Sequence, residues 1–334
     1  MLRIGVVGVG RLGSLFARAL NDHSDVAPLI LAGSRPDSAV ELASELSATA
    51  CSSPDDVFNA VDAVVIAAST SAHPALINSA AERGLSIFCE KPLTLDLAST
   101  DEVIAAAGDA GVEMQVGFQR RFDPGYRAAH DAVSSGVVGD VYLVNAASLD
   151  PAPSPEDFVR TSGDLYRDLM VHDFDAIRFV TGHEIEEVFI SGTAHFPAFA
   201  VYQRHRDAGV AGGTLRLSNG SIATVAATRH NPAGYDIRME VHGSEGSVAV
   251  GWDDRMPLHS LEPGFAAPPE TPYRDFLDRF APAYRAEMDA FVDFVAGRIT
   301  NPCPPEDARA AFVAALAAGR SAAENRPVSI AEFA

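Results

Sequence analysis

The sequence predicts two domains of different architecture, an N-terminal α/β domain with a parallel sheet and a C-terminal α+β domain with a largely antiparallel sheet. Strand-like and helix-like segments alternate up to about residue 118, which is typical of β–α–β units. Beyond about residue 140, a long helical pattern is followed by several strand patterns and then by two helical patterns. The length of 334 residues suits two ordinary domains. We expect them to span residues 1–118 and 119–334.

The first domain is expected to consist of short apolar runs that alternate with amphipathic helical patterns. The strands are expected at Ile4–Val7, Leu29–Leu31, Ala63–Ala67 and Leu85–Cys89. The helices are expected at Leu12–Asn21, Ser38–Leu46, Pro74–Arg83 and Ser99–Ala107. Apolar strands joined by helices in this way predict a parallel sheet that is covered on both faces.

The second domain is expected to segregate its strands from its helices. A helical pattern at Asp164–Thr181 precedes runs of alternating β-formers. These runs lie at Glu187–His195, Gly213–Leu217, Ile222–Arg229, Ile237–His242 and Ser247–Val250. Two helical patterns follow, at Ala283–Arg298 and Pro305–Ala323. This order of elements predicts an α+β domain.

The composition disfavours several classes of partner. A formal net charge of −20 disfavours nucleic acids and anionic membrane surfaces, because both attract clustered positive charge. No stretch approaches the roughly 18 uncharged apolar residues of a membrane-spanning helix. The three cysteines, Cys51, Cys89 and Cys303, are widely spaced and odd in number. Such spacing favours reduced thiols and a cytoplasmic location.

A glycine-rich sequence, GVGRLG, follows the first expected strand directly and opens the first expected helix. Gly8 suits a tight turn, Gly10 the close approach of a pyrophosphate, and Gly13 close packing of the helix. Arg11 and Leu12 are candidate cofactor-binding residues at the start of that helix, whose free N–H groups and dipole attract phosphate. A GxGxxG pattern alone is weak evidence, because glycines also mark ordinary turns. In this strand–loop–helix context it predicts a Rossmann dinucleotide-binding domain.

The end of the second expected strand bears on the choice of cofactor. An Asp or Glu about 20 residues after the glycine loop is typical of NAD sites, because it binds the ribose 2′-hydroxyl. Here the strand ends in Gly33 and is followed by Ser34 and Arg35. A guanidinium can bind a 2′-phosphate that a carboxylate would repel. We therefore favour NADP over NAD, with a solvated Arg35 at the start of a helix as the alternative.

Lys91, in the sequence FCEKPL, is the only lysine in the chain. It follows the strand expected at Leu85–Cys89, and ligands of open α/β sheets bind at the carboxyl ends of strands. Its compact ammonium group can contact a single substrate hydroxyl, which a broad and permanently charged guanidinium cannot replace. The alternative is a surface lysine retained by chance.

Asp168 and His172 are four residues apart within the helical pattern of the second domain, and this spacing places them on one helix face. A carboxylate beside an imidazole can fix its orientation and stabilise its protonated form, which suits a general base. The alternative is a hydrogen-bonded pair without a chemical role. A metal site is disfavoured, because no third His or Cys lies nearby at ligand spacing.

Together with the glycine loop, three further motifs resemble one known family. They are CEKPLTLD at residues 89–96, VGFQRRFDP at residues 116–124 and YRDLMVHDFDAIRFVTG at residues 166–182. Over nearly the whole chain the sequence resembles the glucose–fructose oxidoreductase, inositol dehydrogenase and rhizopine catabolism family, also written Gfo/Idh/MocA. Within it, the chain is most similar to bacterial myo-inositol 2-dehydrogenases.

This resemblance implies roles for residues on both domains. It implies a C-terminal domain with a large open-faced mixed sheet that forms homodimer or homotetramer contacts. Lys91 would act near the nicotinamide, His172 would be the general base, and Asp168 would be its partner. Further cofactor-binding residues would be Ser69, Thr70, His73, Glu90 and Gln119. Substrate-binding residues would be Arg120, Asp150 and Tyr235.

The expected activity is that of an NAD(P)-dependent oxidoreductase acting on a secondary hydroxyl of a cyclic polyol or sugar. Ser34 and Arg35 depart from the aspartate of NAD-preferring inositol dehydrogenases, and Leu149 stands where a polar residue is expected. One alternative is an NADP-dependent aldose dehydrogenase or keto-sugar reductase. Another is a cofactor-binding redox regulator without turnover, which would have no need for Lys91, Asp168 and His172 together.

Overall fold

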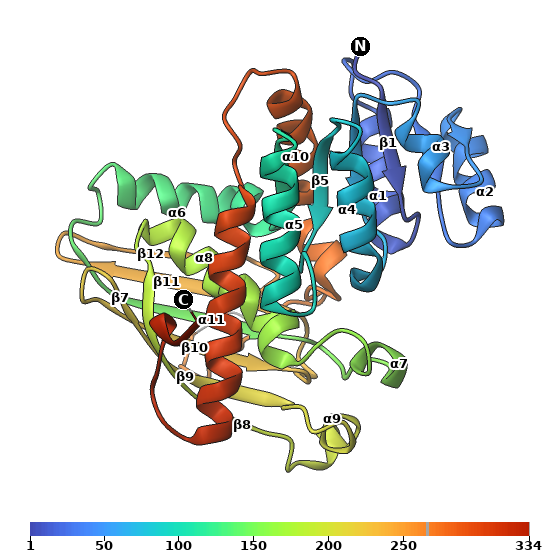
Figure 1. Ribbon diagram of the computed structural model, residues 1–334. Coiled ribbons are helices and arrows are strands. Elements are labelled where there is room, and N and C mark those ends of the chain that lie inside the picture. Colours follow the sequence, from blue (N-terminus) through green and yellow to red (C-terminus); the bar gives the residue numbers. More distant parts are fainter. Residues whose placement is uncertain (265–266, 334) are drawn as a thin grey trace. The chain divides into compact units, whose positions relative to one another are not determined.

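The computed structural model describes residues 1–264 and 267–333, and the chain divides into two compact units (Figure 1). The first comprises residues 1–122 and 282–309, and the second comprises residues 123–281 and 310–334. The first unit therefore ends close to the expected boundary at residue 118. It also includes a stretch near the C-terminus that the sequence prediction placed in the second domain.

A six-stranded parallel sheet forms the centre of the first unit. Its strands, in spatial order, are β3 (Thr49–Ala50), β2 (Ile30–Ala32), β1 (Ile4–Val7), β4 (Ala63–Ile66), β5 (Ser86–Glu90) and β6 (Met114–Gly117). The strand order reverses at β1, which lies between β2 and β4. This is the strand order of the Rossmann fold, so the predicted α/β architecture is confirmed.

The helices of the first unit connect these parallel strands. They are α1 (Arg11–Asn21), α2 (Pro36–Leu46), α3 (Pro54–Phe58), α4 (His73–Ala81) and α5 (Leu97–Asp109), with short 3₁₀ turns η1 (Thr70–Ala72) and η2 (Gln119–Phe122). The C-terminal part of α10 (Phe276–Val295) and the start of α11 (Pro305–Glu324) also belong to this unit. Helix α10 begins earlier than expected, because it continues through Pro282.

An aromatic cluster joins the distant stretches of the first unit. The Phe88 ring of β5 packs edge-on against Phe16 of α1 and Phe291 of α10, with ring centroids 5.4 and 5.7 Å apart. Tyr284 of α10 contacts Phe16 in the same way. Because such rings bury large apolar areas, α10 completes the core on this side of the sheet.

A seven-stranded mixed sheet forms the second unit. Its spatial order is β12 (Ser247–Val250), β11 (Asp236–Gly243), β7 (Val141–Leu149), β10 (Ile222–Thr228), β9 (Val210–Leu217), β8 (Ile185–Thr193) and β13 (Val328–Ser329). Only β7 and β10 pair in parallel, and the other neighbouring strands are antiparallel. The predicted mostly antiparallel sheet is thus confirmed, although the central strand β7 was not predicted.

The remaining elements of the second unit precede or follow these strands. They are α6 (Pro124–Ser134), α7 (Glu156–Val159), the π-helical turn η3 (Tyr166–Met170), α8 (Val171–Thr181), η4 (Pro197–Phe199), α9 (Ala200–Arg204) and η5 (Ile330–Phe333). The helix expected at Asp164–Thr181 therefore begins as a π-helical turn before it becomes α-helical.

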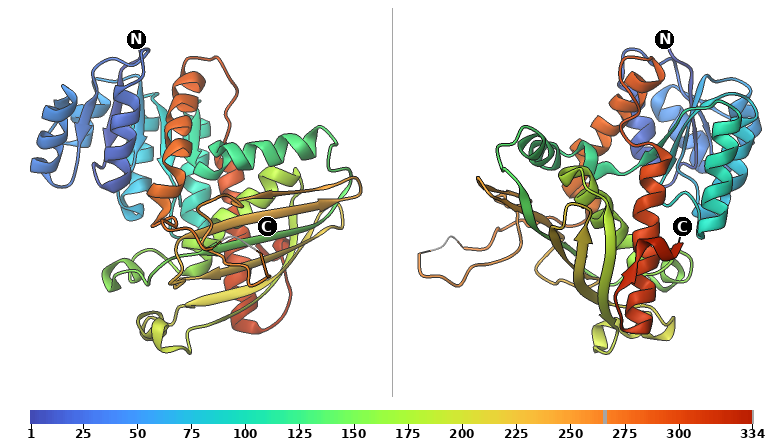
Figure 2. Two further views of the ribbon diagram at one scale, coloured as in Figure 1. Left: turned by 180° about the vertical axis from the view of Figure 1, so that it is seen from behind. Right: turned by 60° about the vertical axis from the view of Figure 1, so that its left-hand side comes forward.

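One face of the mixed sheet packs against helices. Figure 2 shows α8 and α11 on the same side of this sheet. The buried Ser148 of β7 donates a hydrogen bond to Asp173 of α8 at 2.7 Å, and Ser321 of α11 accepts one from the Ile190 backbone N–H at 3.0 Å. Burial alternates along β8 and β10, so Phe189 and Ile222 are exposed, with Ile222 at 50%.

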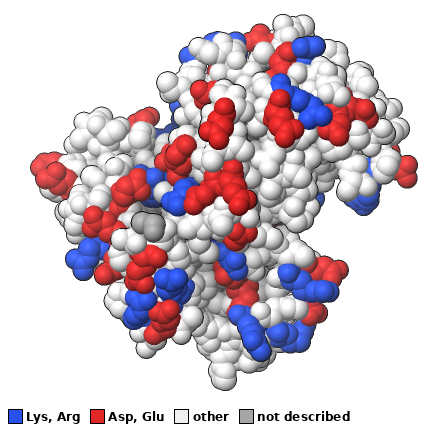
Figure 3. Space-filling view, viewed as in Figure 1, with Lys and Arg blue, Asp and Glu red and all other residues white. Residues whose placement is uncertain are grey.

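The face of the molecule seen in Figure 3 has no broad basic region among its described residues. Arg side chains there lie singly or in small groups among acidic ones. Within the described part of the chain, no helix is both long enough and apolar enough to cross a membrane.

Candidate active site

The three glycines of the loop between β1 and α1 differ in the space around them. Gly8 has a φ of +98°, and a Cβ at Gly13 would lie 1.7 Å from the Gly8 carbonyl oxygen. The fold itself therefore requires glycine at both positions. By contrast, a Cβ at Gly10 would meet none of the described atoms within 4 Å. Gly10 leaves the start of α1, at Arg11 and Leu12, open to an approaching anion.

Parallel register brings three segments, the glycine loop among them, to one edge of the sheet. Val7 of β1 pairs with Ile66 of β4, and Ile66 pairs with Cys89 of β5. The residues that follow these strands are consequently neighbours at the carboxyl ends. The segments are the glycine loop, the turn containing Ser69 and Thr70, and the Glu90–Lys91 pair.

His73, expected to bind the cofactor, lies in the interior instead of on the exposed loop. Its Nδ1 is 3.0 Å from the Pro92 carbonyl oxygen, and its Nε2 is 3.1 Å from the Ala68 carbonyl oxygen. Burial lowers the pKa of His73. The ring thus connects the loop after β4 to the segment after β5, whereas Ser69 is exposed.

Glu90 and Lys91 occupy the end of β5. Glu90 is only 8% exposed, and its Oε2 accepts a hydrogen bond from the Lys91 backbone N–H at 3.1 Å. A Cβ at Gly117 of β6 would come within 3.0 Å of Glu90 Oε1, so glycine there makes room for the carboxyl group. Burial raises the pKa of Glu90 to about 7, although the charge of Lys91 opposes this shift. Lys91 itself is partly buried.

The turn η2, which follows β6, holds Gln119 and Arg120. Both side chains are buried, at 4% and 2% exposed. The next residue, Arg121, was not singled out from the sequence, yet it is also buried and pairs with Asp307 of α11 at 2.8 Å. This ion pair joins the C-terminal stretch of the first unit to η2.

Residues of the second unit meet at one edge of the mixed sheet. Leu149 of β7 pairs with Thr228 of β10 and with Asp236 of β11. Asp150, Arg229 and Tyr235, which adjoin these positions, therefore lie at the same edge. Two of them, Asp150 and Tyr235, were expected to bind substrate.

Asp168 is paired with an arginine that the sequence did not reveal. Its Oδ2 lies 2.9 Å from Nη2 of Arg229, and Nη1 of Arg229 lies 3.2 Å from Oδ2 of Asp150. His172, expected as the partner of Asp168, is 8% exposed and lies in the first turn of α8. Asp168 lies in the π-helical turn η3 and His172 in the following α8, so the helix that carries both residues is not a regular α-helix throughout.

Tyr235 is packed within the second unit. It is 5% exposed, and its ring meets Phe280 edge-on at 6.4 Å. Its backbone N–H donates to the Tyr273 carbonyl oxygen at 2.8 Å. Tyr235 thus lies at the edge of the sheet that also holds Asp150 and Arg229, and its ring is buried.

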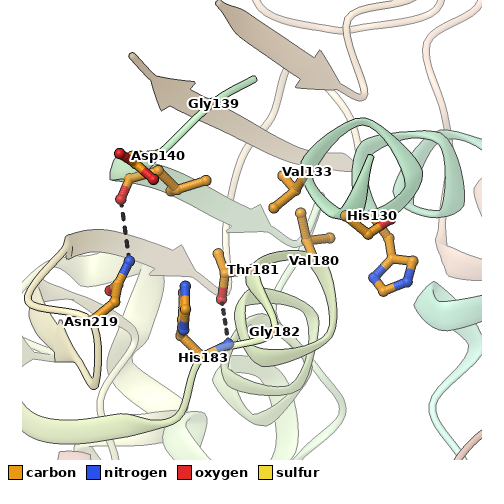
Figure 4. A pocket seen from close by; sticks show the side chains of 11 residues that line it. His130, Val133, Gly139, Asp140, Val180, Thr181, Gly182, His183 and Asn219 are labelled. Carbon is orange, nitrogen blue, oxygen red and sulfur yellow. Dashed lines mark hydrogen bonds between the residues drawn. The ribbon is translucent and has the colours of Figure 1, made fainter. Parts of the chain in front are cut away.

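Two other features bear on alternative sites. Among the described residues, no group of three His, Cys, Asp or Glu side chains is arranged to hold a metal ion. A hollow of about 610 Å³ lies around the start of β7 and the end of α8 (Figure 4). Its lining includes His130, Asp140 and Asn219, and none of the predicted site residues contributes to it.

The Rossmann sheet and its glycine loop are typical of a dinucleotide-binding domain. Residues 2–118 match the family model for an oxidoreductase family with an NAD-binding Rossmann fold. Residues 126–249 match the GFO/IDH/MocA C-terminal domain. The chain belongs to the Gfo/Idh/MocA oxidoreductase family, and the resemblance inferred from its motifs is confirmed.

Its similarity to inositol dehydrogenases extends over the full length of the chain. A myo-inositol dehydrogenase of Streptomyces leeuwenhoekii is 38% identical over 96% of this chain and 97% of its own. An inositol 2-dehydrogenase of Rhizobium meliloti is 34% identical over 99% of both chains. A scyllo-inositol dehydrogenase of Lactobacillus casei, solved with NAD(H) and scyllo-inositol, superposes with a TM-score of 0.88 at 27% identity over 99% of both chains.

The glycine loop yields a matched pair of variants. We expect Gly13→Ala to destabilise the fold by about 1–3 kcal/mol, because its Cβ would overlap the Gly8 carbonyl oxygen. Gly10→Ala should change stability by less than about 0.5 kcal/mol, yet weaken NAD(H) binding at least about tenfold, or about 1.4 kcal/mol. Urea unfolding and fluorescence titration measure the two effects. Unchanged affinity in Gly10→Ala would show that the pyrophosphate does not approach there.

The buried carboxyl group of Glu90 predicts a pH-dependent stability. Between about pH 4.5 and 7 the folded protein retains a proton on Glu90 that the unfolded chain releases, so rising pH destabilises the fold. Glu90→Gln should remove this loss and gain up to about 3 kcal/mol over wild type as pH rises through that window. The exposed Glu113→Gln is the control. Equal pH dependence in wild type and Glu90→Gln would contradict the assignment.

Proposed function

We propose that this oxidoreductase oxidises a secondary hydroxyl of an inositol-type cyclic polyol with NAD(P)⁺. Lys91 carries the proposal, because the only lysine of the chain follows β5 at the sheet edge that holds the glycine loop. Full-length similarity to inositol dehydrogenases supports the same substrate class. A panel of inositols and aldoses, each offered with NAD⁺ and NADP⁺ and followed at the absorbance of the reduced nicotinamide, tests it.

The proposed roles follow from the chemistry of each side chain. A bound nicotinamide cofactor would supply the acceptor for the hydride of the carbinol carbon. His172 takes the hydroxyl proton as general base. Lys91 donates a hydrogen bond to the same oxygen and stabilises the negative charge that develops on it. Asp150 and Asp168 accept hydrogen bonds from neighbouring hydroxyls of the ring.

The proposed subunit arrangement and location rest on other features. We infer a homodimer or homotetramer that buries the open face of the mixed sheet, where Phe189 and Ile222 are exposed; the mass in solution decides between them. We place the protein in the cytoplasm, which is supported by three cysteines that form no disulfide.

The base and the lysine are tested together by substitution. We expect His172→Ala to lower kcat roughly 10²- to 10⁴-fold, the usual effect of losing general base catalysis, with little change in cofactor affinity. Lys91→Arg should be nearly as damaging as Lys91→Ala, because a displacement of the hydroxyl by about 1 Å can cost about 10²-fold. Steady-state kinetics measures both. Near-normal turnover in His172→Ala, or an active Lys91→Arg, would refute the corresponding role.

The cofactor preference is a separate proposal. Ser34 and Arg35 are exposed directly after β2, beside β1, and supply a cation in place of the usual carboxylate. We therefore propose that NADP⁺ is used at least as well as NAD⁺, and that Ser34→Asp shifts the preference to NAD⁺. The ratio of kcat/KM for the two cofactors is the measurement. A wild-type ratio strongly in favour of NAD⁺ would show that Arg35 does not bind a 2′-phosphate.

A further inference from the structure

Arg229 is a buried cation that bridges two carboxylates from separate elements. It follows β10, and its side chain is only 4% exposed. One terminal nitrogen lies 3.2 Å from Asp150 at the end of β7, and the other lies 2.9 Å from Asp168 in η3. A buried guanidinium is costly unless its charge is compensated. Here each of its terminal nitrogens has a carboxylate of its own.

The surroundings of Arg229 hold its side chain in one place. Its guanidinium carbon lies 5.9 Å from the centre of the Tyr202 ring, and the Tyr202 hydroxyl accepts a hydrogen bond from the Ser154 backbone N–H at 2.8 Å. The Arg229 backbone N–H donates to the Gly209 carbonyl oxygen at 2.8 Å. Backbone and side chain of Arg229 are thus both fixed.

The charges around Arg229 are unequal in number. Burial lowers the pKa of Arg229, but the carboxylates of Asp168 and Asp150 outweigh burial and raise it above its ordinary value. Burial also raises the pKa of Asp207, and the charge of Arg229 opposes that rise. The carboxylates of Asp150, Asp168 and Asp207 therefore all interact electrostatically with the one guanidinium of Arg229. Its loss would leave several negative charges close together in a poorly solvated place.

We propose that Arg229 is a positioning residue of the active site, which holds Asp168 and Asp150 charged and at a fixed separation for hydrogen bonds to neighbouring hydroxyls of the substrate. This inference rests on the proposed polyol oxidation. A planar guanidinium presents two N–H groups in a rigid fork, whereas a lysine offers one point charge. Arg229 is therefore matched to two carboxylates that approach from different elements.

A purely structural role would make different demands on the same residue. An ion pair that only fastens η3 to the sheet would lower stability when removed, but it would leave the pH profile and the substrate KM unchanged. Arg178 provides a matched control, because it is 9% exposed and pairs with Glu184 at 2.7 Å, at the other end of α8. Arg178→Gln should lose stability without changing either kinetic property.

The test compares Arg229→Gln, Arg229→Lys and Arg178→Gln in the full-length enzyme. We expect Arg229→Gln to lower kcat/KM for the polyol about 10²-fold, to leave KM for the cofactor unchanged, and to move the acidic limb of the pH profile to higher pH. Arg229→Lys should lose at least about tenfold, because one ammonium cannot bridge both carboxylates. Adding Asp168→Asn to Arg229→Gln should lower kcat/KM little further, since the effects of substitutions at interacting residues do not simply add.

The outcomes separate this inference from the proposed function. If wild type oxidises no polyol, the proposed function fails, and ¹³C NMR of the Asp168 carboxyl then tests without turnover whether Arg229 holds Asp168 charged. Proton uptake by Asp168 at higher pH in Arg229→Gln supports that part of the inference, and an unchanged midpoint overturns the proposal. If Arg229→Gln does not fold, Arg229→Lys is decisive. Wild-type kinetics in Arg229→Lys, or full additivity with Asp168→Asn, also overturns the proposal.

Discussion

The parallel register of β1, β4 and β5 determines where the cofactor-site residues of the first unit lie. Because Val7, Ile66 and Cys89 pair across these three strands, the glycine loop, the Ser69 turn and Lys91 emerge at one edge. Gly8 and Gly13 are then required by the backbone alone. A Cβ at Gly10 would meet none of the described atoms within 4 Å, and we propose that this glycine serves the approach of a pyrophosphate.

Much of the first unit could be predicted from the sequence, because its signals are local. The glycines follow directly after the β-branched strand at Ile4–Val7, and the single lysine follows directly after another strand. Each of these signals can therefore be recognised from a few neighbouring residues. The short strand β3 and helix α3 were not predicted, since two and five residues carry too little periodicity. Strand β7 was missed although it is central, because its Asn145, Ala146 and Ser148 are weak strand formers.

The electrostatics of the second unit could not be predicted from the sequence, because they depend on tertiary contacts. Asp168 and His172 are close in the sequence, which suggested a pair, whereas Arg229 is far from Asp168 along the chain. Only the parallel pairing of β7 with β10 places Asp150 beside Arg229. His73 shows the same limit, because its motif suggested a cofactor contact while its ring lies between two backbone carbonyl groups.

The first unit is built from two stretches that lie far apart in the sequence, and this constrains how the chain can fold during synthesis. Its core includes Phe291 against Phe88, and its end includes Asp307 against Arg121. While residues 123–281 are being synthesised, residues 1–122 have already been made, but Phe291 and Asp307 have not. The nascent first unit thus exposes part of its aromatic core until residues 282–309 have been synthesised. Contacts over such long sequence separations slow folding and leave apolar surface open to aggregation or to chaperones in the meantime.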